Sequence, residues 1–301
     1  MIKFLKNGLI LCVVLILVSC TNSQLSTNTS EVNSAENSAE TVTEAVVDRV
    51  VALSSLTADI TQQLAASKLV GIPGSDVLKE DPRFAELPTV SSGRTPPNLE
   101  AIVALEPELV LGAAGFHDAI TQRLDEIGIA TQLVKVDSWE TLTQITEDLA
   151  DRLSADAEPL LERYQACLAK APIQGKSTLV LVSRQPILAP NKTSWAGDFL
   201  QEFNTPNLAA ELQGESPIGG YVTLSAEKVL QENPDTILIV DPGNEGILEQ
   251  FQKDVFWKQL QASQNDRIYT VDYYGLINPG SIGKIEEACN KLGEIMENSG
   301  S

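Results

Sequence analysis

The chain has 301 residues, and its 41 acidic side chains outnumber its 21 basic ones, for a formal net charge of −20 at pH 7. This balance excludes nucleic acid as a main partner, because phosphate contacts need lysine and arginine. One histidine and four cysteines leave few side chains for metal ligation or acid–base catalysis. After a leader segment, enough chain remains for one large domain or two of ordinary size.

The first twenty residues have the pattern of a secretory signal. Lys3 and Lys6 give a basic start, an apolar run follows at 8–18, and Leu17-Val18-Ser19 precedes Cys20. The run is too short to span a bilayer comfortably. The Leu-x-Ser-Cys pattern resembles the bacterial lipobox, which implies cleavage before Cys20 and lipidation of that residue. We expect residues 1–19 to be a lipoprotein signal peptide; an ordinary signal peptide and an uncleaved anchor are the alternatives.

Residues 20–45 are rich in Ser, Thr, Asn, Glu and Ala and contain almost nothing apolar. This composition predicts a disordered tether behind the lipidated Cys20. Acyl chains at Cys20 would hold the protein at a membrane face without inserting it. We therefore expect an extracytoplasmic protein that is lipid-anchored to a membrane, at the periplasmic face or the cell surface.

From residue 46 onward, apolar strand patterns alternate with helical patterns, as in a parallel sheet with helices on both faces. The predicted strands are at 49–54, 69–72, 109–111 and 131–136, and the predicted helices at 57–66, 119–127 and 138–153. These elements predict an N-terminal αβ lobe at 46–153.

A further helix is predicted at 156–170, with Asp156 as its N-cap and Pro159 in its first turn, where a missing N–H costs little. Fifteen helical residues extend about 22 Å, so residues 154–172 could join two lobes as one rod. Residues 173–301 are predicted to form a C-terminal αβ lobe. Its expected strands are at 178–182, 237–240 and 267–271, and its expected helices at 197–203, 248–260 and 282–296.

One segment recurs in both predicted lobes. Residues 99–111 and 226–238 each predict a short helix, a Pro-acidic pair and an apolar strand, and Glu100 and Glu227 lie 127 positions apart. A repeated αβ element favours two lobes of similar build. Either glutamate alone fits the general preference for acidic residues at a helix N-terminus. The matched pair places one carboxylate at the same local position of each lobe.

An ordered set of motifs resembles the substrate-binding proteins of bacterial ABC importers for iron–siderophore complexes, haem and vitamin B12. The motifs are at 49–53, 69–71, 98–111, 224–238, 257–260 and 267–269, and the resemblance covers about 47–297. It implies an α/β fold of the class III, helical-backbone type. In that fold, two Rossmann-like αβα lobes are bridged by a single long α-helix, and the ligand is held in the cleft between them. It also implies that Glu100 and Glu227 dock onto arginines of a permease dimer, a contact that orients and steers more than it adds affinity.

The loops after the carboxyl ends of strands are expected to line the cleft. Arg94 and Arg184 could neutralise anionic oxygens of a metal chelate, although an arginine on an acidic protein commonly pairs with a local carboxylate. Flat contact surface is expected from aromatic residues in these loops: Phe116, Trp195, Tyr221, Tyr273 and Tyr274. Such residues can instead cap the core, and we expect about half of the set to touch ligand. Trp139 and Trp257 are assigned to the core.

His117 is the only histidine, so a bare transition-metal site, which needs several His and carboxylate ligands, is not expected. His117, Tyr273 or Tyr274 could ligate haem iron, and a solvated loop histidine is the simpler interpretation. Few arginines in the cleft loops count against a highly anionic triscatecholate. We expect a monomer without a resident cofactor that binds a small-molecule iron chelate. A hydroxamate or citrate-type siderophore is favoured, with haem or cobalamin as alternatives.

An enzyme is not expected, because the chain has no Gly-x-Ser-x-Gly motif, no phosphate-binding glycine loop and no histidine to pair with Cys167 or Cys289. A non-transport lipoprotein that contacts the envelope or cell wall on the same fold is the other alternative. Cys167 and Cys289 lie in helical patterns. Both a disulfide in an oxidising envelope and two free buried thiols fit this placement.

Overall fold

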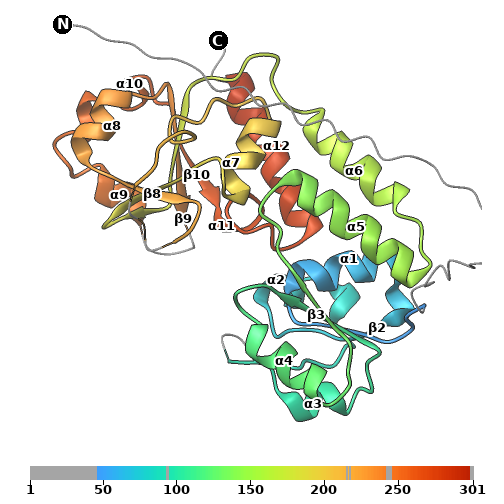
Figure 1. Cartoon of the computed structure of the whole chain (residues 1–301). Coiled ribbons are helices and arrows are strands. Elements are labelled where there is room, and N and C mark those ends of the chain that lie inside the picture. Colours follow the sequence, from blue (N-terminus) through green and yellow to red (C-terminus); the bar gives the residue numbers. More distant parts are fainter. Residues whose placement is uncertain (1–45, 93–94, 215, 217, 242–245, 299–301) are drawn as a thin grey trace, which may run out of the picture. The chain divides into compact units, whose positions relative to one another are not determined.

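The computed structural model describes residues 46–298 except for 93–94, 215, 217 and 242–245 (Figure 1). The predicted signal peptide, Cys20 and the tether lie outside the described residues. Within the described part, no helix has the length and apolar character needed to cross a membrane. The fold is α/β, as predicted, with parallel sheets whose strands alternate with helices.

The first sheet contains four parallel strands in the order β2-β1-β3-β4. Their bounds are Val50–Ala52 (β1), Leu69–Gly71 (β2), Leu109–Ala113 (β3) and Thr131–Val134 (β4). Val50 lies in register with Leu69 on one side and with Leu109 on the other. All three residues of β1 are fully buried, as expected for the centre of a parallel sheet that is covered on both faces.

Helices cover both faces of this sheet, and the alternation of strand side chains decides which residues meet them. Val50 and Leu109 share a core with residues of α1 (Ser55–Ala65) and α5 (Trp139–Leu153). Val51 and Val110 instead pack with residues of α3 (Leu99–Val103) and α4 (Asp118–Glu126). Figure 1 shows α3 and α4 on one side of the strands and α1 and α5 on the other. The shorter elements are η1 (Ala66–Lys68), α2 (Asp76–Lys79) and η2 (Pro82–Phe84).

The helix predicted at 156–170 is present as α6, which runs Glu158–Leu168. It begins two residues later than predicted, with Ala157 rather than Asp156 at the N-cap position, and Pro159 lies in its first turn as expected. The Asp156 carboxylate still accepts a hydrogen bond from the amide of Glu158 at 3.0 Å. The side chain therefore caps an early amide although the helical backbone starts after it.

The second parallel sheet has the order β10-β9-β5. Its strands are β5 (Thr178–Leu181), β9 (Thr236–Asp241) and β10 (Ile268–Asp272). The helices of this part are α7 (Trp195–Glu202), α8 (Ala226–Glu232), α9 (Ile247–Phe251), α10 (Gln261–Gln264), α11 (Tyr273–Leu276) and α12 (Ile282–Asn298). The four strands of the first sheet fall within 46–153 and these three within 173–301.

A small antiparallel sheet of order β6-β7-β8 was not predicted. Its strands are β6 (Ser183–Arg184), β7 (Ile187–Pro190) and β8 (Tyr221–Leu224). The first two form a hairpin too short to give a periodic pattern: Ser183 and Arg184 were expected in a loop, and no element was predicted at 187–190. The alternation of buried Val222 and Leu224 with exposed Thr223 was the available signal for β8.

The predicted single helix at 248–260 is wrong. Helix α9 ends at Phe251, and after a turn the chain continues through η3 (Trp257–Gln259) into α10. In the turn, the Asp254 carboxylate pairs with Arg184, while the rings of Phe251 and Trp257 stack at 5.1 Å. The apolar residues that suggested one helix are buried, but they lie on two short helical segments and the turn between them.

The repeated segment adopts the same local structure in both places. In α3 the side chain of Asn98 accepts a hydrogen bond from the third helical amide at 3.1 Å, and in α8 Ser225 does the same at 3.1 Å. In both segments the residue before the proline has a positive φ: Asn233 (43°) is the C-cap of α8, and Glu106 (47°) lies three residues after the end of α3. The repeat therefore predicted both the helix start and its termination.

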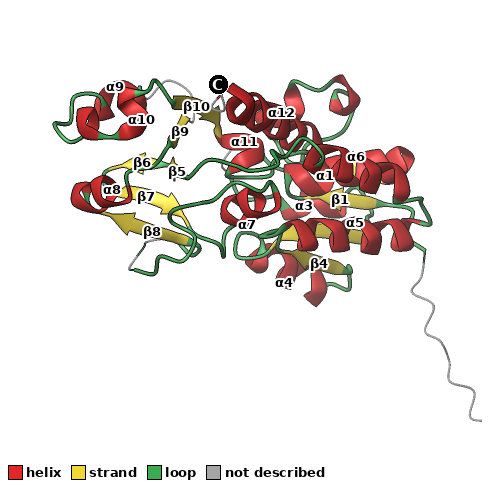
Figure 2. Cartoon of the chain, turned by 90° about the horizontal axis from the view of Figure 1, so that it is seen from above, coloured by secondary structure: helices red, strands yellow, loops and turns green. Residues whose placement is uncertain are grey.

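Helix α6 is fastened to α12, and α12 also packs on α1 (Figure 2). Cys167 and Cys289 form a disulfide across the first contact, with Cα atoms 5.6 Å apart, which decides between the two alternatives left open above. Arg163 makes a bidentate ion pair with Glu286 at 2.7 and 2.9 Å and donates to the side chain of Gln63 on α1. Covalent and polar contacts thus tie three helices from distant parts of the chain.

Candidate functional site

A cleft of about 860 Å³ opens at the carboxyl ends of the strands of the first sheet. Every strand of that sheet contributes the loop that follows it, as ligand sites in such folds generally require. The opposite side comes from the start of α7, the start of β8 and the segment around α11. The lining includes Ser54, Ser55, Ser75, Asp76, Ser91, Thr95, Ala113, Ala114, Phe116, His117, Lys135, Asp137, Trp195, Tyr221, Tyr273, Tyr274 and Asn278.

The wall formed by the first sheet carries small hydroxyl side chains. Ser54 is the N-cap of α1, and its hydroxyl lies 2.8 Å from that of Thr57. The hydroxyl of Ser91 accepts a hydrogen bond from the Gly74 amide at 3.1 Å. Because the amides of a helix's first turn lack intrahelical partners, the start of α1 adds partial positive charge here. This wall offers donors suited to ligand oxygens.

The opposite wall is aromatic. Tyr273 and Tyr274 pack edge to face with ring centroids 5.3 Å apart. Burial, together with a smaller effect of the nearby Tyr273, raises the pKa of Tyr221 to about 12. The Tyr221 phenol therefore stays neutral at physiological pH and keeps an O–H to donate. Flat rings with polar tips suit a ligand that has both apolar and polar surface.

Trp195 is largely buried behind the cleft surface and packs against the residues that form this wall. Its side chain is only 4% exposed, its ring stacks on Trp139 at 5.7 Å, and its indole N–H donates to the carbonyl of Gly275 at 2.8 Å. The carboxylate of Asp198, also on α7, accepts the Trp139 amide at 2.6 Å. Burial raises the pKa of Asp198, and the nearby Asp137 and Glu140 raise it as well. These contacts hold the first turn of α7 against the start of α5.

Five of the seven predicted ligand-binding residues line the cleft: Phe116, Trp195, Tyr221, Tyr273 and Tyr274. Phe116 is 87% exposed at its rim. Arg184 is not brought to the cleft, because its guanidinium pairs with Asp254 at 2.6 and 2.9 Å. Arg94 lies outside the described residues. Trp139 and Trp257 are buried, as predicted.

Sequence reasoning missed the lining residues that follow β2 and β4, among them Ser75, Asp76, Lys135 and Asp137. Their position directly after predicted strands was the signal that could have found them. Asp76 is paired with Lys79 at 2.8 Å, and this hydrogen bond lowers its pKa. Lys135 is paired with Asp137 at 2.5 Å. Along the described lining, then, no arginine or lysine is left without an ion-pair partner.

His117 lies in the loop between β3 and α4, at the N-cap position of α4. Its Nδ1 accepts a hydrogen bond from the Ala113 amide at 2.9 Å. Burial lowers the pKa of the imidazole, while the neighbouring Asp118 opposes this effect. Over residues 46–298, where described, no group of three or more His, Cys, Asp or Glu side chains is placed to hold a metal ion.

Glu100 and Glu227 occupy equivalent positions on α3 and α8, in the first turn of each helix, and both are exposed. Hydrogen bonds from its own backbone amide and from the Ser225 hydroxyl lower the pKa of Glu227. The arrangement presents one carboxylate from each repeated element to solvent.

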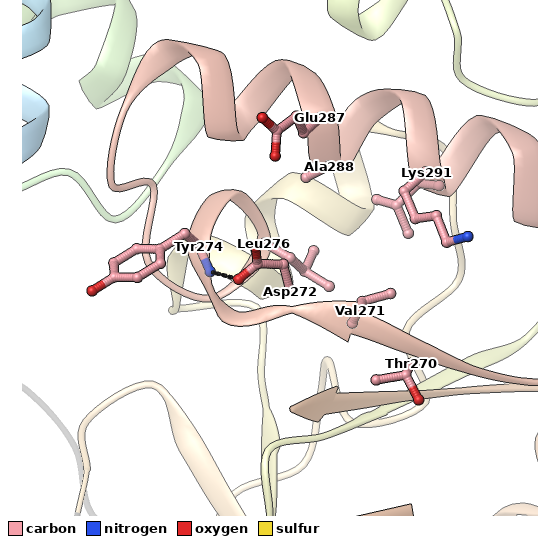
Figure 3. A pocket seen from close by; sticks show the side chains of 9 residues that line it. Thr270, Val271, Asp272, Tyr274, Leu276, Glu287, Ala288 and Lys291 are labelled. Atoms are coloured by element: carbon pink, nitrogen blue, oxygen red, sulfur yellow. Dashed lines mark hydrogen bonds between the residues drawn. The ribbon is translucent and has the colours of Figure 1, made fainter. Parts of the chain in front are cut away.

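A second cavity of about 300 Å³ lies between β10, α11 and α12 (Figure 3). Val271, Leu276 and Leu292 give it an apolar floor, and Asp272, Glu287 and Lys291 surround it. The Tyr274 amide donates to the Asp272 carboxylate at 3.0 Å, and the Tyr274 ring points away from Lys291. This cavity has about a third of the volume of the cleft and none of its convergent loops.

Comparison with known proteins places the chain in a family. The profile of the periplasmic binding protein family matches residues 50–274. The Fe(3+) dicitrate-binding periplasmic protein FecB of Escherichia coli is 25% identical over 188 residues, which cover 60% of each chain. The Fe(3+)-citrate-binding protein YfmC of Bacillus subtilis is 23% identical over 190 residues, covering 60% of this chain and 58% of YfmC.

Solved structures share the fold. An ABC transporter substrate-binding protein from Listeria monocytogenes superposes with a TM-score of 0.68 at 22% identity, covering 83% of this chain and 99% of that one. The periplasmic haem-binding protein HutB of Vibrio cholerae gives a TM-score of 0.67 at 22% identity, covering 82% and 98%. The chain belongs to the periplasmic binding protein family, which confirms the resemblance to substrate-binding proteins of the iron–siderophore, haem and vitamin B12 importers.

Proposed function

We propose that this protein is an extracytoplasmic solute-binding protein that captures a ferric chelate in the cleft and delivers it to an ABC permease. The observation that carries the proposal is the pairing of two unlike walls, hydroxyl side chains on one side and Tyr221, Tyr273 and Tyr274 on the other. The cleft volume of about 860 Å³ is within the range of small-molecule sites. Binding needs no resident cofactor and no chemical change in the ligand.

The charge of the cleft favours a chelate of low net charge. Lys135, a cation of the described lining, is already paired with Asp137, and Arg184 is paired elsewhere. A highly anionic triscatecholate would have to be held without a free guanidinium from these residues, and such a group is the usual partner of clustered anionic oxygens. A hydroxamate siderophore matches this charge, because three hydroxamate groups neutralise Fe³⁺. A citrate-type chelate is included because the names of FecB and YfmC point to citrate chemistry in two relatives.

Delivery is assigned to the exposed pair Glu100 and Glu227, which would contact arginines of a permease dimer. The lipid anchor at Cys20 would keep a monomeric binding protein near that permease. Replacing Cys20 with alanine should abolish incorporation of labelled fatty acid into the protein without changing its ligand affinity. Incorporation of the label into this variant would contradict lipidation at Cys20.

Intrinsic fluorescence tests the ligand class, since tyrosines line the cleft and Trp195 lies at its edge. The purified protein is titrated with ferric citrate, ferrichrome, haem and cyanocobalamin, and with iron-free citrate and desferriferrichrome as controls. Saturable quenching by a ferric hydroxamate or ferric citrate, but not by the iron-free compound, supports the proposal. Saturable binding of haem or cobalamin alone would reassign the cargo, and no binding at all would favour a non-transport envelope role.

Phe116 offers a matched test of the cleft. The change Phe116→Ala removes an exposed ring at the rim and should weaken chelate binding about twofold to tenfold, since aromatic contacts contribute about 0.5–1.5 kcal/mol. The control is Ile173→Ala, which removes another fully exposed apolar side chain that does not line the cleft. Neither change should move the thermal midpoint. Equal affinity of the two variants would remove Phe116 from the site.

A further inference from the structure

The loop between β3 and α4 holds the His117 ring in one orientation. The amide of Ala113 donates to Nδ1 at 2.9 Å, and the Ala113 carbonyl accepts the His117 amide at 3.0 Å. The His117 carbonyl in turn accepts both the amide and the hydroxyl of Thr121 at 3.0 Å. A Cβ at Gly112 would lie 3.0 Å from that of His117, so glycine permits the close packing of this loop. The ring is therefore fixed by its own backbone surroundings.

The contact with Ala113 decides where the imidazole carries its proton. A backbone N–H can only donate, so Nδ1 must present its lone pair, and the single proton of the neutral ring then sits on Nε2. Protonating Nδ1 would set two N–H groups against each other. Burial acts in the same direction by lowering the pKa of the ring. At neutral pH the stable form is the uncharged Nε2–H tautomer.

The ring lines the cleft, and in the part of the chain that the structure describes, no residue accepts a hydrogen bond from Nε2. Asp118, which is exposed on α4, is the charged neighbour of the ring. Asp76, Lys135 and Asp137 line the same cleft. A half-buried N–H without a protein partner incurs a desolvation penalty unless a ligand or solvent oxygen meets it.

We propose that His117 acts as a fixed neutral donor, giving its Nε2–H to an oxygen atom of the bound ferric chelate rather than ligating the iron. This assignment rests on the proposed function. Iron ligation needs an unprotonated ring nitrogen, and the lone pair of Nδ1 is already used by Ala113. The ligand class is accordingly a chelate that presents a carbonyl, hydroxamate or carboxylate oxygen toward the wall formed by the first sheet.

The protonation state can be measured without any ligand. His117 is the only histidine, so histidine labelled with ¹⁵N gives ring signals from this residue alone. Nε2 is distinguished from Nδ1 because only Nε2 couples strongly to both carbon-bound ring protons. In the ligand-free protein at pH 7, a pyrrole-type Nε2 and a pyridine-type Nδ1 are expected. A pyrrole-type Nδ1, or an imidazolium, would overturn the proposal whatever the protein binds.

Two substitutions separate the donor from the loop contact. The amide oxygen of asparagine lies near the position of Nδ1, so His117→Asn can keep the bond to Ala113 but loses the Nε2 donor. The amide nitrogen of glutamine lies near Nε2, so His117→Gln keeps the donor. With ferric citrate and ferrichrome as probes, we expect His117→Asn to bind about tenfold more weakly and His117→Gln to stay within about threefold of the wild type.

The outcomes distinguish this proposal from the one on which it rests. Wild-type affinity in His117→Asn, or a greater loss in His117→Gln, would refute the donor role alone. Failure of the wild type to bind either chelate would refute the proposed cargo and the donor role together. Haem binding with a histidine–iron absorption band that disappears in both variants would show ligation and overturn the proposal. Circular dichroism of each variant confirms that it is folded.

Discussion

At the scale of single residues, Asp59 connects parts of the chain that are distant in sequence, and no sequence pattern around it predicts these contacts. This fully buried carboxylate on α1 accepts one hydrogen bond from Arg83 at 2.9 Å and another from the Ile282 amide, the first residue of α12, at 2.8 Å. Gln63, one helical turn along, donates to it at 3.3 Å. A buried carboxylate needs such partners, because an unpaired one is strongly destabilising.

Replacing Asp59 with asparagine should lower the free energy of unfolding by about 2–3 kcal/mol. The amide loses its charge toward Arg83 and cannot accept both bonds in the same way. Urea unfolding followed by circular dichroism measures the change. The control is Asp81→Asn, the other partner of Arg83, which lies nearer the surface and should cost less than about 1 kcal/mol. Equal losses would contradict a special role for Asp59.

His117 should add a pH dependence to stability. Its pKa is lowered in the folded state, so the unfolded chain takes up this proton more readily as the pH falls below about 6.5. The contribution of His117 is therefore present at neutral pH and is lost as the pH falls through the folded-state pKa.

The comparison of wild type with His117→Asn isolates this effect. Free energies of unfolding are measured in urea at pH 7.5, 6.5 and 5.5. The wild type should lose more stability than the variant between the first and the last of these values, since asparagine does not titrate. Parallel losses would show that other groups account for the whole dependence.

At the scale of secondary-structure elements, the parallel strands were predicted well from the sequence, whereas the antiparallel hairpin and the bend after α9 were not. Residues of β1, β5 and β9 are short apolar runs buried on both faces, and such runs are recognisable without tertiary information. The hairpin of β6 and β7 was missed because its strands are very short. The bend after Phe251 was missed because its cause, Arg184 meeting Asp254, joins residues 70 positions apart.

Part of the candidate site could also be predicted from the sequence. Aromatic residues directly after strands could be identified, since the carboxyl ends of parallel strands converge. The pairing of Arg184 away from the cleft and the burial of Trp195 against Trp139 could not, because both depend on how distant elements pack. Ser75 and Asp76 have no sequence feature beyond their position after β2.

The disulfide between α6 and α12 allows a prediction at the same scale. Cys167 and Cys289 close a loop of 122 residues, for which the loop-entropy estimate is about 5 kcal/mol. The double change to serine should lower the thermal midpoint markedly, and a reducing agent should lower that of the wild type alone. Neither cysteine lines the cleft, so chelate affinity at low temperature should be unchanged.

Alkylation under denaturing, non-reducing conditions provides the control for this experiment. Mass spectrometry should find Cys167 and Cys289 unmodified before reduction and modified after it. Alkylation of both residues before reduction would show that the bond does not form.

At the scale of the whole molecule, the proposed docking role requires a partner that contacts both repeated elements at once. Glu100 lies on α3, which packs against the first sheet, and Glu227 lies on α8, which packs against strands of the later part of the chain. One exposed carboxylate contributes little binding energy, while two on separate elements define an orientation. A partner that recognises this orientation must contact the carboxylates of Glu100 and Glu227 at the same time.

The double change Glu100→Arg with Glu227→Arg should abolish uptake of the ferric chelate in cells and leave its affinity for the purified protein unchanged. Reversal of both charges would set like charges against the permease. The control is Glu158→Arg with Glu249→Arg, which makes the same charge change at two other exposed first-turn glutamates. Normal transport by the first variant would exclude the docking role.

The contact between Asp59 and the first amide of α12 joins residues 223 positions apart. During synthesis, residue 59 is made long before residue 282. Asp59 of α1 therefore lacks its partner on α12 until the chain is nearly complete. The native contacts of α1 are thus complete only after residue 282 has been made. A chain truncated before α12 lacks this contact, so we expect proteases to cleave it faster than the full-length protein.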